Sequence, residues 1–109
     1  MNHKPVDYEI GSDNVFADLG LEDAPELLAK ARLAYRISQI IEKRRLTQFA
    51  AAKVLGIDQP KVSALVRGHL EKFSMERLCE FLTALGCDVT IQVREKRRPR
   101  GGRLIVKAA

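Results

Sequence analysis

The feature that most constrains this chain is a pair of short helix-forming stretches between residues 47 and 68. The residues that start or stop helices here are Thr47, Gly56, Asp58, Pro60 and Gly68. The threonine and the aspartate can each accept a backbone N–H of a first helical turn, and the proline is tolerated only in such a turn. The glycines can adopt the left-handed conformation in which helices end. The sequence therefore predicts two helices, over 48–55 and from 59 to about 67, that meet at a tight turn.

Apolar residues in this stretch can hold the second helix against a core. Ala52 is small where the two helices must cross. At roughly 100° per residue, Val62 and Leu65 centre on one side of the second helix, and Ile57 can pin the same helix from behind. The residues that lie opposite this side or flank it are Gln59, Pro60, Lys61, Ser63, Ala64 and Arg67. We expect this second group to face outward.

Two further helices and one strand are predicted around this pair. A long amphipathic helix follows Asp23, a good N-cap, and ends near Arg45. Its apolar positions, spaced three or four residues apart, are Leu27, Ala31, Ala34, Ile37 and Ile41. Another helix begins at Ser74, with Leu78, Phe81, Leu82 and Leu85 as its apolar stripe, and Gly86 closes it. Beyond it, Val89, Ile91 and Val93 alternate with polar residues, which predicts a strand buried on one face.

A single strand would leave its backbone hydrogen-bonding groups without partners. Two pairing partners are possible, namely the same strand of a second copy of the chain, or a strand over residues 103–107. We favour a homodimer, with Val89, Ile91 and Val93 as the candidate dimerisation residues. The expected fold class is mainly α, with four to five helices followed by one C-terminal strand.

Length and residue types narrow the possible function classes. At 109 residues the chain suits one compact core, and no apolar run approaches the about eighteen residues that cross a bilayer. We therefore expect a cytoplasmic protein without a membrane partner. Cys79 and Cys87 form no CxxC pair, and His3 and His69 lie far apart, so we expect neither a metal nor a cofactor. The sequence also lacks catalytic triads, HExxH motifs and glycine-rich phosphate loops, so we expect no enzyme and no small-molecule substrate.

Charge is strongly segregated along the chain, whose net charge is +5. Residues 1–26 hold one lysine against seven carboxylates, whereas residues 94–109 hold seven cations against one carboxylate. Residues 27–93 carry the remaining net charge of +5. The basic middle and end favour nucleic acid as a partner, and the acidic head indicates a partner of another kind. The alternative is that both ends are merely solvated.

The stretch from Thr47 to Gly68 resembles the helix-turn-helix of Xre/Cro-type repressors in its small residue, its turn glycine and its apolar anchors. A wider pattern, covering roughly residues 12–94, is similar to the compact antitoxins of HigA type within that superfamily. Its parts are Asn14–Leu21, the stretch above, Phe73–Leu78 and Leu82–Ile91. The resemblance implies a lambda-repressor-like bundle and a dimeric antitoxin that represses its own operon and neutralises an RNA-cleaving toxin. It does not cover the basic residues after Arg94.

In such a repressor the outward face of the second helix reads double-stranded operator DNA in the major groove. Gln59 can pair with an adenine edge, Lys61 with guanine, and Ser63 with a base or a phosphate. Ala64 can touch a thymine methyl group, and Pro60 shares this face. By resemblance, the phosphate-binding residues are Thr47, Gln48 and Arg67, with Arg45, Lys53 and Lys72 as weaker candidates. Each of these polar residues could instead be an ordinary solvated side chain.

The acidic head is a candidate site for binding a basic toxin. Tyr8, Ile10 and Phe16 are interleaved among its carboxylates and could become ordered on such a surface. Phe16 and its neighbours up to Leu21 could instead pack on the long helix. The expected organisation is an acidic, partly flexible segment over 1–22, a DNA-binding domain with its strand over 23–94, and a basic tail over 95–109.

Two other functions stay open beside the antitoxin. The chain could be a stand-alone Xre-type transcriptional regulator without a toxin. It could also be a protein-interaction module whose helical corner has no DNA role.

Overall fold

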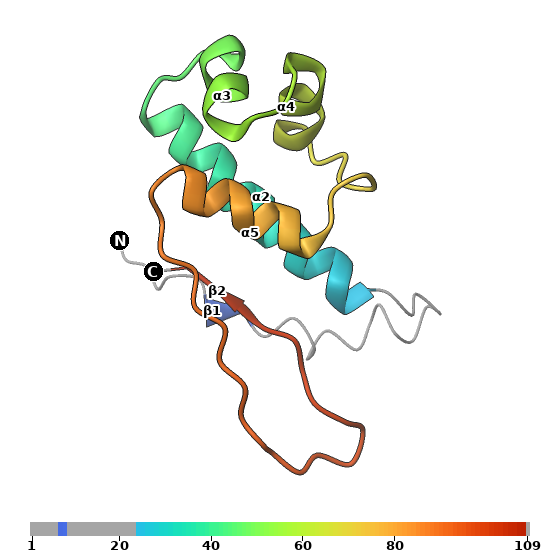
Figure 1. Cartoon of the computed structure of the whole chain (residues 1–109). Coiled ribbons are helices and arrows are strands. Elements are labelled where there is room, and N and C mark those ends of the chain that lie inside the picture. The colour runs from blue at the N-terminus through green and yellow to red at the C-terminus, as the bar shows by residue number, and fades with distance from the viewer. Residues whose placement is uncertain (1–6, 9–23, 109) are drawn as a thin grey trace. The chain divides into compact units, whose positions relative to one another are not determined.

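The computed structural model describes residues 7–8 and 24–108 of the chain. Its elements, labelled in Figure 1, are β1 (Asp7–Tyr8), α2 (Ala24–Lys43), α3 (Gln48–Leu55), α4 (Gln59–Val66), α5 (Met75–Ala84) and β2 (Val106–Lys107). The chain divides into two compact units, one over Lys30–Thr90 and one that combines Met1–Ala29 with Ile91–Ala109. The mainly helical fold class, with one short strand near the C-terminus, is confirmed. The Lys30–Thr90 unit lies inside the domain predicted over 23–94.

Side-chain caps begin the three shorter helices at the predicted residues. In each cap a backbone N–H donates to a side-chain oxygen over 3.0 Å, and the donor and acceptor residues are Ala50 to Thr47, Lys61 to Asp58, and Arg77 to Ser74. Helix α3 ends at Gly56, whose φ is +74° and whose N–H donates to the carbonyl of Ala52 over 2.8 Å. The predicted cap of α2, Asp23, lies outside the described residues.

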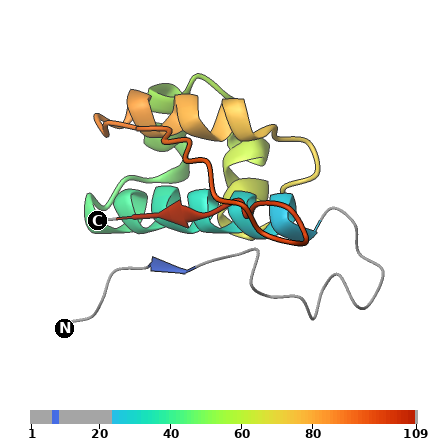
Figure 2. The same cartoon turned by 90° about the horizontal axis from the view of Figure 1, so that it is seen from below.

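The core of the Lys30–Thr90 unit is built from the apolar faces of all four helices. Its largest fully buried side chains are Ile37, Val62, Leu65, Leu78, Phe81 and Leu85. Each contributes about 1.5–3 kcal/mol through the apolar surface that it removes from water. In both views α5 runs along α2, and α3 packs on α4 and α5 (Figures 1 and 2). This packing is close because Ala51 and Ala52 of α3 are small and buried. The core therefore fixes α3 and α4 relative to each other.

The predicted strand over Val89, Ile91 and Val93 is wrong for the single chain. Residues 87–98 are described, and they form neither helix nor strand. Ile91 and Val93 are 80% and 89% exposed, and Val89 is half-buried. The physical reason is that a strand needs a hydrogen-bonded neighbour, and the chain supplies none to this segment within its described residues.

The C-terminal strand lies further along the chain than predicted. Val106–Lys107 pairs antiparallel with Asp7–Tyr8, so that Asp7 faces Lys107 and Tyr8 faces Val106. Residues 103–107 were the second possible partner for the predicted strand. They do contain a strand, but it pairs with Asp7–Tyr8. None of the helices in the described part of the chain is both long and apolar enough to cross a bilayer.

Candidate nucleic-acid interface

Helix α4 has one buried side and one open side. Val62 and Leu65 are 0% and 1% exposed and anchor the helix to the core. Gln59, Pro60 and Lys61 are exposed, as is Arg67 just after the helix. Ser63 and Ala64 are half-buried. At the N-terminal end of α4, three successive exposed side chains therefore project from a helix that the core holds in place.

The turn before α4 determines which residues project there. Gly56 has left-handed backbone geometry and lets the chain reverse after α3, and Asp58 then caps α4. Because the cap fixes the first turn, Gln59 and Lys61 leave the helix at defined positions. Backbone N–H groups at a helix N-terminus also carry partial positive charge, which favours nearby anions such as phosphate.

The N-terminus of α3 is also exposed. Thr47 and Gln48 are both accessible, and the Thr47 hydroxyl accepts the N–H of Ala50. A hydroxyl that accepts a hydrogen bond still has its own proton to donate, so Thr47 can cap α3 and contact an anion as well. Phe49 is 58% exposed, and the Lys53 Nζ lies 5.2 Å from the centre of its ring, in a cation–π contact.

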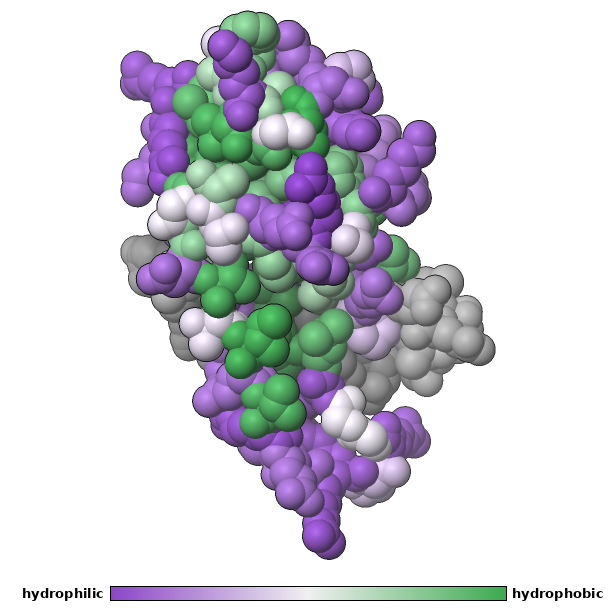
Figure 3. Space-filling view, in the orientation of Figure 1, coloured by the Kyte–Doolittle hydropathy of each residue, from purple (hydrophilic) through white to green (hydrophobic). Residues whose placement is uncertain are grey.

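A groove of about 670 Å³ joins α3, the turn and the start of α4 to one residue of α5. Its lining residues are Phe49, Ala52, Lys53, Gly56, Ile57, Asp58, Gln59, Lys61 and Arg77. Three of these are cations, and the one carboxylate, Asp58, already accepts the N–H of Lys61. The groove is therefore positively charged and suited to a polyanion. In Figure 3 the end of the molecule where Figure 1 labels α3 and α4 shows hydrophilic side chains with apolar patches between them. The exposed large apolar residues of α3 and α4 are Phe49, Val54 and Val66.

The groove contains two residues that sequence reasoning missed. Arg77 lies near the start of α5, donates to Glu80 over 3.0 Å and stacks 4.8 Å above the ring of Phe81. Only the tertiary fold brings Arg77 beside α4, so the sequence carried no signal for it. Phe49 did carry a signal, because a large aromatic residue there lies off the buried face of α3.

The remaining predicted phosphate contacts lie outside this groove. Arg45 follows α2 with a φ of +55°, Arg67 follows α4, and Lys72 lies in the loop before α5. All three side chains are exposed. The structure thus brings Lys53, Gln59 and Lys61 together around one hollow, and spreads the other candidates along the neighbouring turns.

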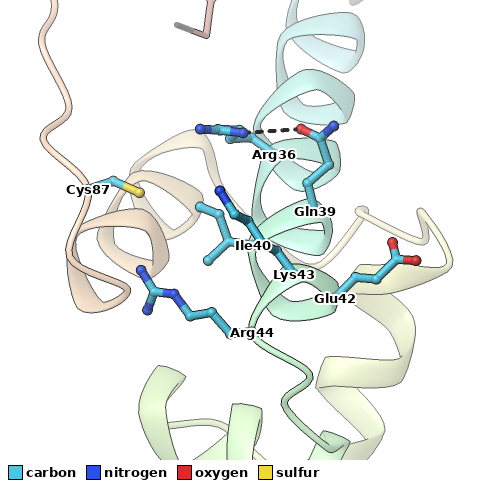
Figure 4. Close-up of a pocket in the computed structure, with 7 residues that line it drawn as sticks. All are labelled: Arg36, Gln39, Ile40, Glu42, Lys43, Arg44 and Cys87. Atoms are coloured by element: carbon cyan, nitrogen blue, oxygen red, sulfur yellow. Dashed lines mark hydrogen bonds between the residues drawn. The ribbon is translucent and has the colours of Figure 1, made fainter.

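A second hollow of about 620 Å³ lies against the C-terminal half of α2 (Figure 4). Its lining residues are Arg36, Gln39, Ile40, Glu42, Lys43, Arg44 and Cys87. Arg44 donates to the carbonyl of Leu85 over 2.8 Å, so it satisfies the backbone at the end of α5. Arg36 donates to Gln39 over 3.4 Å. Three of the polar side chains here, those of Arg36, Gln39 and Arg44, therefore make hydrogen bonds within the protein itself.

Neither Cys79 nor Cys87 lines the groove at α3 and α4. Burial raises the pKa of the Cys79 thiol, which opposes formation of the thiolate. No cluster of three or more His, Cys, Asp or Glu side chains that could hold a metal occurs within residues 7–8 and 24–108. Tyr8 lies in β1, and Ile10 and Phe16 lie outside the described residues.

Comparisons with known proteins agree with this geometry. The model of a family described as a helix-turn-helix domain matches residues 15–94. A solved structure described as a putative XRE family transcriptional regulator is 50% identical in sequence, with a TM-score of 0.72. The likeness covers 80% of this chain and 98% of that chain. No curated protein matches the sequence. The matched region contains α2 to α5 and ends where the basic residues begin.

Proposed function

Since this chain belongs to the helix-turn-helix domain family, in its XRE-type branch, we propose that it binds double-stranded DNA through α3 and α4 and regulates transcription. The observation that carries the proposal is the two-sidedness of α4. Val62 and Leu65 hold the helix from behind, and Gln59 to Lys61 project beside a cationic groove. A major groove admits such a helix and displays base edges to it.

The proposed base contacts follow from the exposure of each side chain. Gln59 and Lys61 are long and exposed, so they can reach an adenine edge and a guanine edge. Ser63 and Ala64 are short and half-buried, so they contact a base only where α4 lies closest to the groove floor. Pro60 fills the same surface without a side-chain donor.

The proposed phosphate contacts orient the protein on the duplex. Thr47 and Gln48 are placed at the N-terminus of α3, where exposed hydrogen-bonding groups and the helix dipole both favour a phosphate. Lys53 and Arg77 add positive charge in the same groove. Arg45, Arg67 and Lys72 are accessible for further phosphates along the neighbouring turns.

We further propose that the chain acts as a homodimeric repressor. Residues 89–93 form neither helix nor strand and pair with no strand in the described part of the chain, and Ile91 and Val93 expose apolar side chains that water solvates poorly. Pairing with the same segment of a second copy would satisfy the backbone and bury these side chains. A dimer would also present two copies of α4 to half-sites about 34 Å apart.

The narrowest proposal is an antitoxin of HigA type that neutralises a basic, RNA-cleaving toxin. Its support is the acidic head of the sequence, with Tyr8, Ile10 and Phe16 among seven carboxylates. A stand-alone regulator is the alternative, and it is favoured by the similar solved structure, whose description is a transcriptional regulator. Coexpression with the product of the neighbouring gene separates the two. A small basic protein that copurifies, and whose RNA cleavage stops on binding, supports the antitoxin.

In vitro selection from a pool of random duplexes tests DNA reading. We expect a recurring sequence with two half-sites related by two-fold symmetry and centred about one helical turn apart. The selected duplex should bind about 10³-fold or more tightly than a scrambled one. If repeated rounds with folded protein enrich no sequence, the proposed DNA reading is wrong, and the protein-interaction module becomes the better account.

A further inference from the structure

The basic segment, defined as residues 94–100, has a composition that packing does not explain. Its seven residues carry five cations and one carboxylate, and two glycines follow. Apart from Pro99 it offers no apolar side chain to a core. The matched family region ends at Arg94, so the helix-turn-helix fold itself does not require these charges. We therefore expect these charges to interact with a binding partner.

The backbone presents the basic segment as a loop. The N–H of Gly101 donates to the carbonyl of Arg98 over 3.1 Å, and Gly101 has a φ of +86°. Pro99 stands second in this four-residue turn, a position for which its fixed φ is suited. Every cation of the segment is exposed except Arg98, which is half-buried. The turn thus holds a set of positive side chains at the surface.

Interactions within the segment leave its charge largely unneutralised. The Arg97 Nε lies 3.9 Å from a carboxylate oxygen of Glu95, but these side chains are 91% and 84% exposed. Water screens an ion pair so exposed, and it contributes little. Arg94 donates to the amide oxygen of Gln92 over 3.3 Å, which compensates no charge. The segment keeps a net charge of +4 for an external anion.

We propose that the basic segment binds the sugar-phosphate backbone of the duplex beside the bases that α4 reads. This inference rests on the proposed DNA binding of the chain. An arginine guanidinium group can donate two parallel hydrogen bonds to the oxygens of one phosphate. A duplex carries one negative charge per about 1.7 Å of its axis. Such closely spaced cations fit a polyanion better than they fit the scattered carboxylates of a protein surface.

Chain length allows this contact. Arg100 lies ten positions after Thr90, the last residue of the Lys30–Thr90 unit. An extended chain of that length spans at most about 33–36 Å, which is close to one turn of the duplex. Tethering also keeps the cations near the DNA once α4 has bound, which raises their effective concentration. The contacts are independent of base sequence because they involve phosphates alone.

The test compares two triple variants of the full chain on DNA of fixed sequence. One removes charge from the basic segment by Arg94→Gln, Lys96→Gln and Arg97→Gln. The matched control removes the same charge from α2 by Lys30→Gln, Arg32→Gln and Arg36→Gln. For each protein, log affinity is plotted against log salt concentration, with the selected duplex and with a scrambled duplex of equal length. Thermal unfolding confirms that both variants are folded.

We expect the slope of log affinity against log salt concentration to be less steep for the basic-segment variant than for the unmodified protein. The slope should change by about 0.9 for each phosphate that the variant no longer neutralises, up to roughly 2.7. Between 50 and 200 mM salt this amounts to a roughly 40-fold smaller decrease in affinity. The flattening should occur on both duplexes, and the ratio of selected to scrambled affinity should stay within about twofold of the unmodified protein. When the DNA flanks are shortened, the basic-segment variant and the unmodified protein should show the same salt dependence.

A slope equal to that of the control variant would overturn the inference. So would weaker binding to single-stranded RNA with duplex binding unchanged, because the segment would then serve another nucleic acid. The scrambled duplex keeps the two proposals distinguishable. Failure of sequence reading removes the preference for the selected duplex, whereas failure of the basic segment leaves that preference and the salt slope unaltered.

Discussion

Neighbouring residues of α4 have opposite roles, and the role of each depends on whether its side chain is buried or exposed. Val62 is fully buried and holds the helix, while Lys61 beside it is exposed and lines the cationic groove. One residue before the helix, Asp58 neither packs nor contacts DNA in our account, yet its cap determines where Gln59 leaves the backbone. Function at this scale therefore depends on residues that never touch the partner.

Gly56 is the clearest such residue. Its φ is +74°, and a Cβ added there would meet no atom within 4 Å. The cost of Gly56→Ala is therefore backbone strain alone, and we expect the free energy of unfolding to fall by about 1–2 kcal/mol. Urea denaturation measures this change.

The matched control for Gly56 is Gly102→Ala, which also meets no atom within 4 Å and lacks the left-handed φ. It should leave stability unchanged within about 0.5 kcal/mol. Gly56→Asn should recover part of the stability, because asparagine tolerates the left-handed region. Equal effects of the two alanine substitutions would show that the turn does not depend on this backbone conformation.

Elements whose determinants are local could be predicted from the sequence, and elements that depend on distant residues could not. The bounds of α3 follow from Thr47 and Gly56, and those of α4 from Asp58 and the residues after it. Strand pairing depends on residues far apart in the chain, so the alternation over 89–93 could not reveal that β2 forms at 106–107 instead. Arg77 was missed in the groove for the same reason, since only the packing of α5 on α3 brings this side chain into the groove.

Residues 89–93 are expected to form the contact between the two copies of the proposed dimer. In the proposed dimer, Ile91→Lys with Val93→Lys places charges in the shared apolar face, so the particle mass should fall from about twice 12.2 kDa to 12.2 kDa. Light scattering at a fixed protein concentration measures the mass. The control, Thr90→Lys with Gln92→Lys, adds the same charge to the alternate face and should preserve the dimer. A monomeric unmodified protein, or a dimeric double variant, would contradict the proposed pairing.

Across the whole molecule, charge is distributed so that different segments would have different functions. In the proposed complex the Lys30–Thr90 unit would read the sequence, through a few oriented side chains around α4. The basic segment would add affinity without sequence preference, because phosphate contacts depend on charge and salt. Residues 1–26, with their net negative charge, would be repelled by the same duplex and are therefore better suited to a partner of opposite charge. Such a division predicts that specificity and salt dependence respond to different substitutions.

If the open side of α4 reads bases, removing its side chains must change a ratio of two affinities, that for the selected duplex over that for the scrambled one. The variant Gln59→Ala with Lys61→Ala and Ser63→Ala is compared with Ser38→Ala, Gln39→Ala and Lys43→Ala on α2, which removes the same residue types. At about 1–3 kcal/mol for each good contact, the first variant should lower the ratio of selected to scrambled affinity by about 100-fold or more, while the second preserves it. A ratio within twofold of the unmodified protein, in a folded first variant, would contradict the claim.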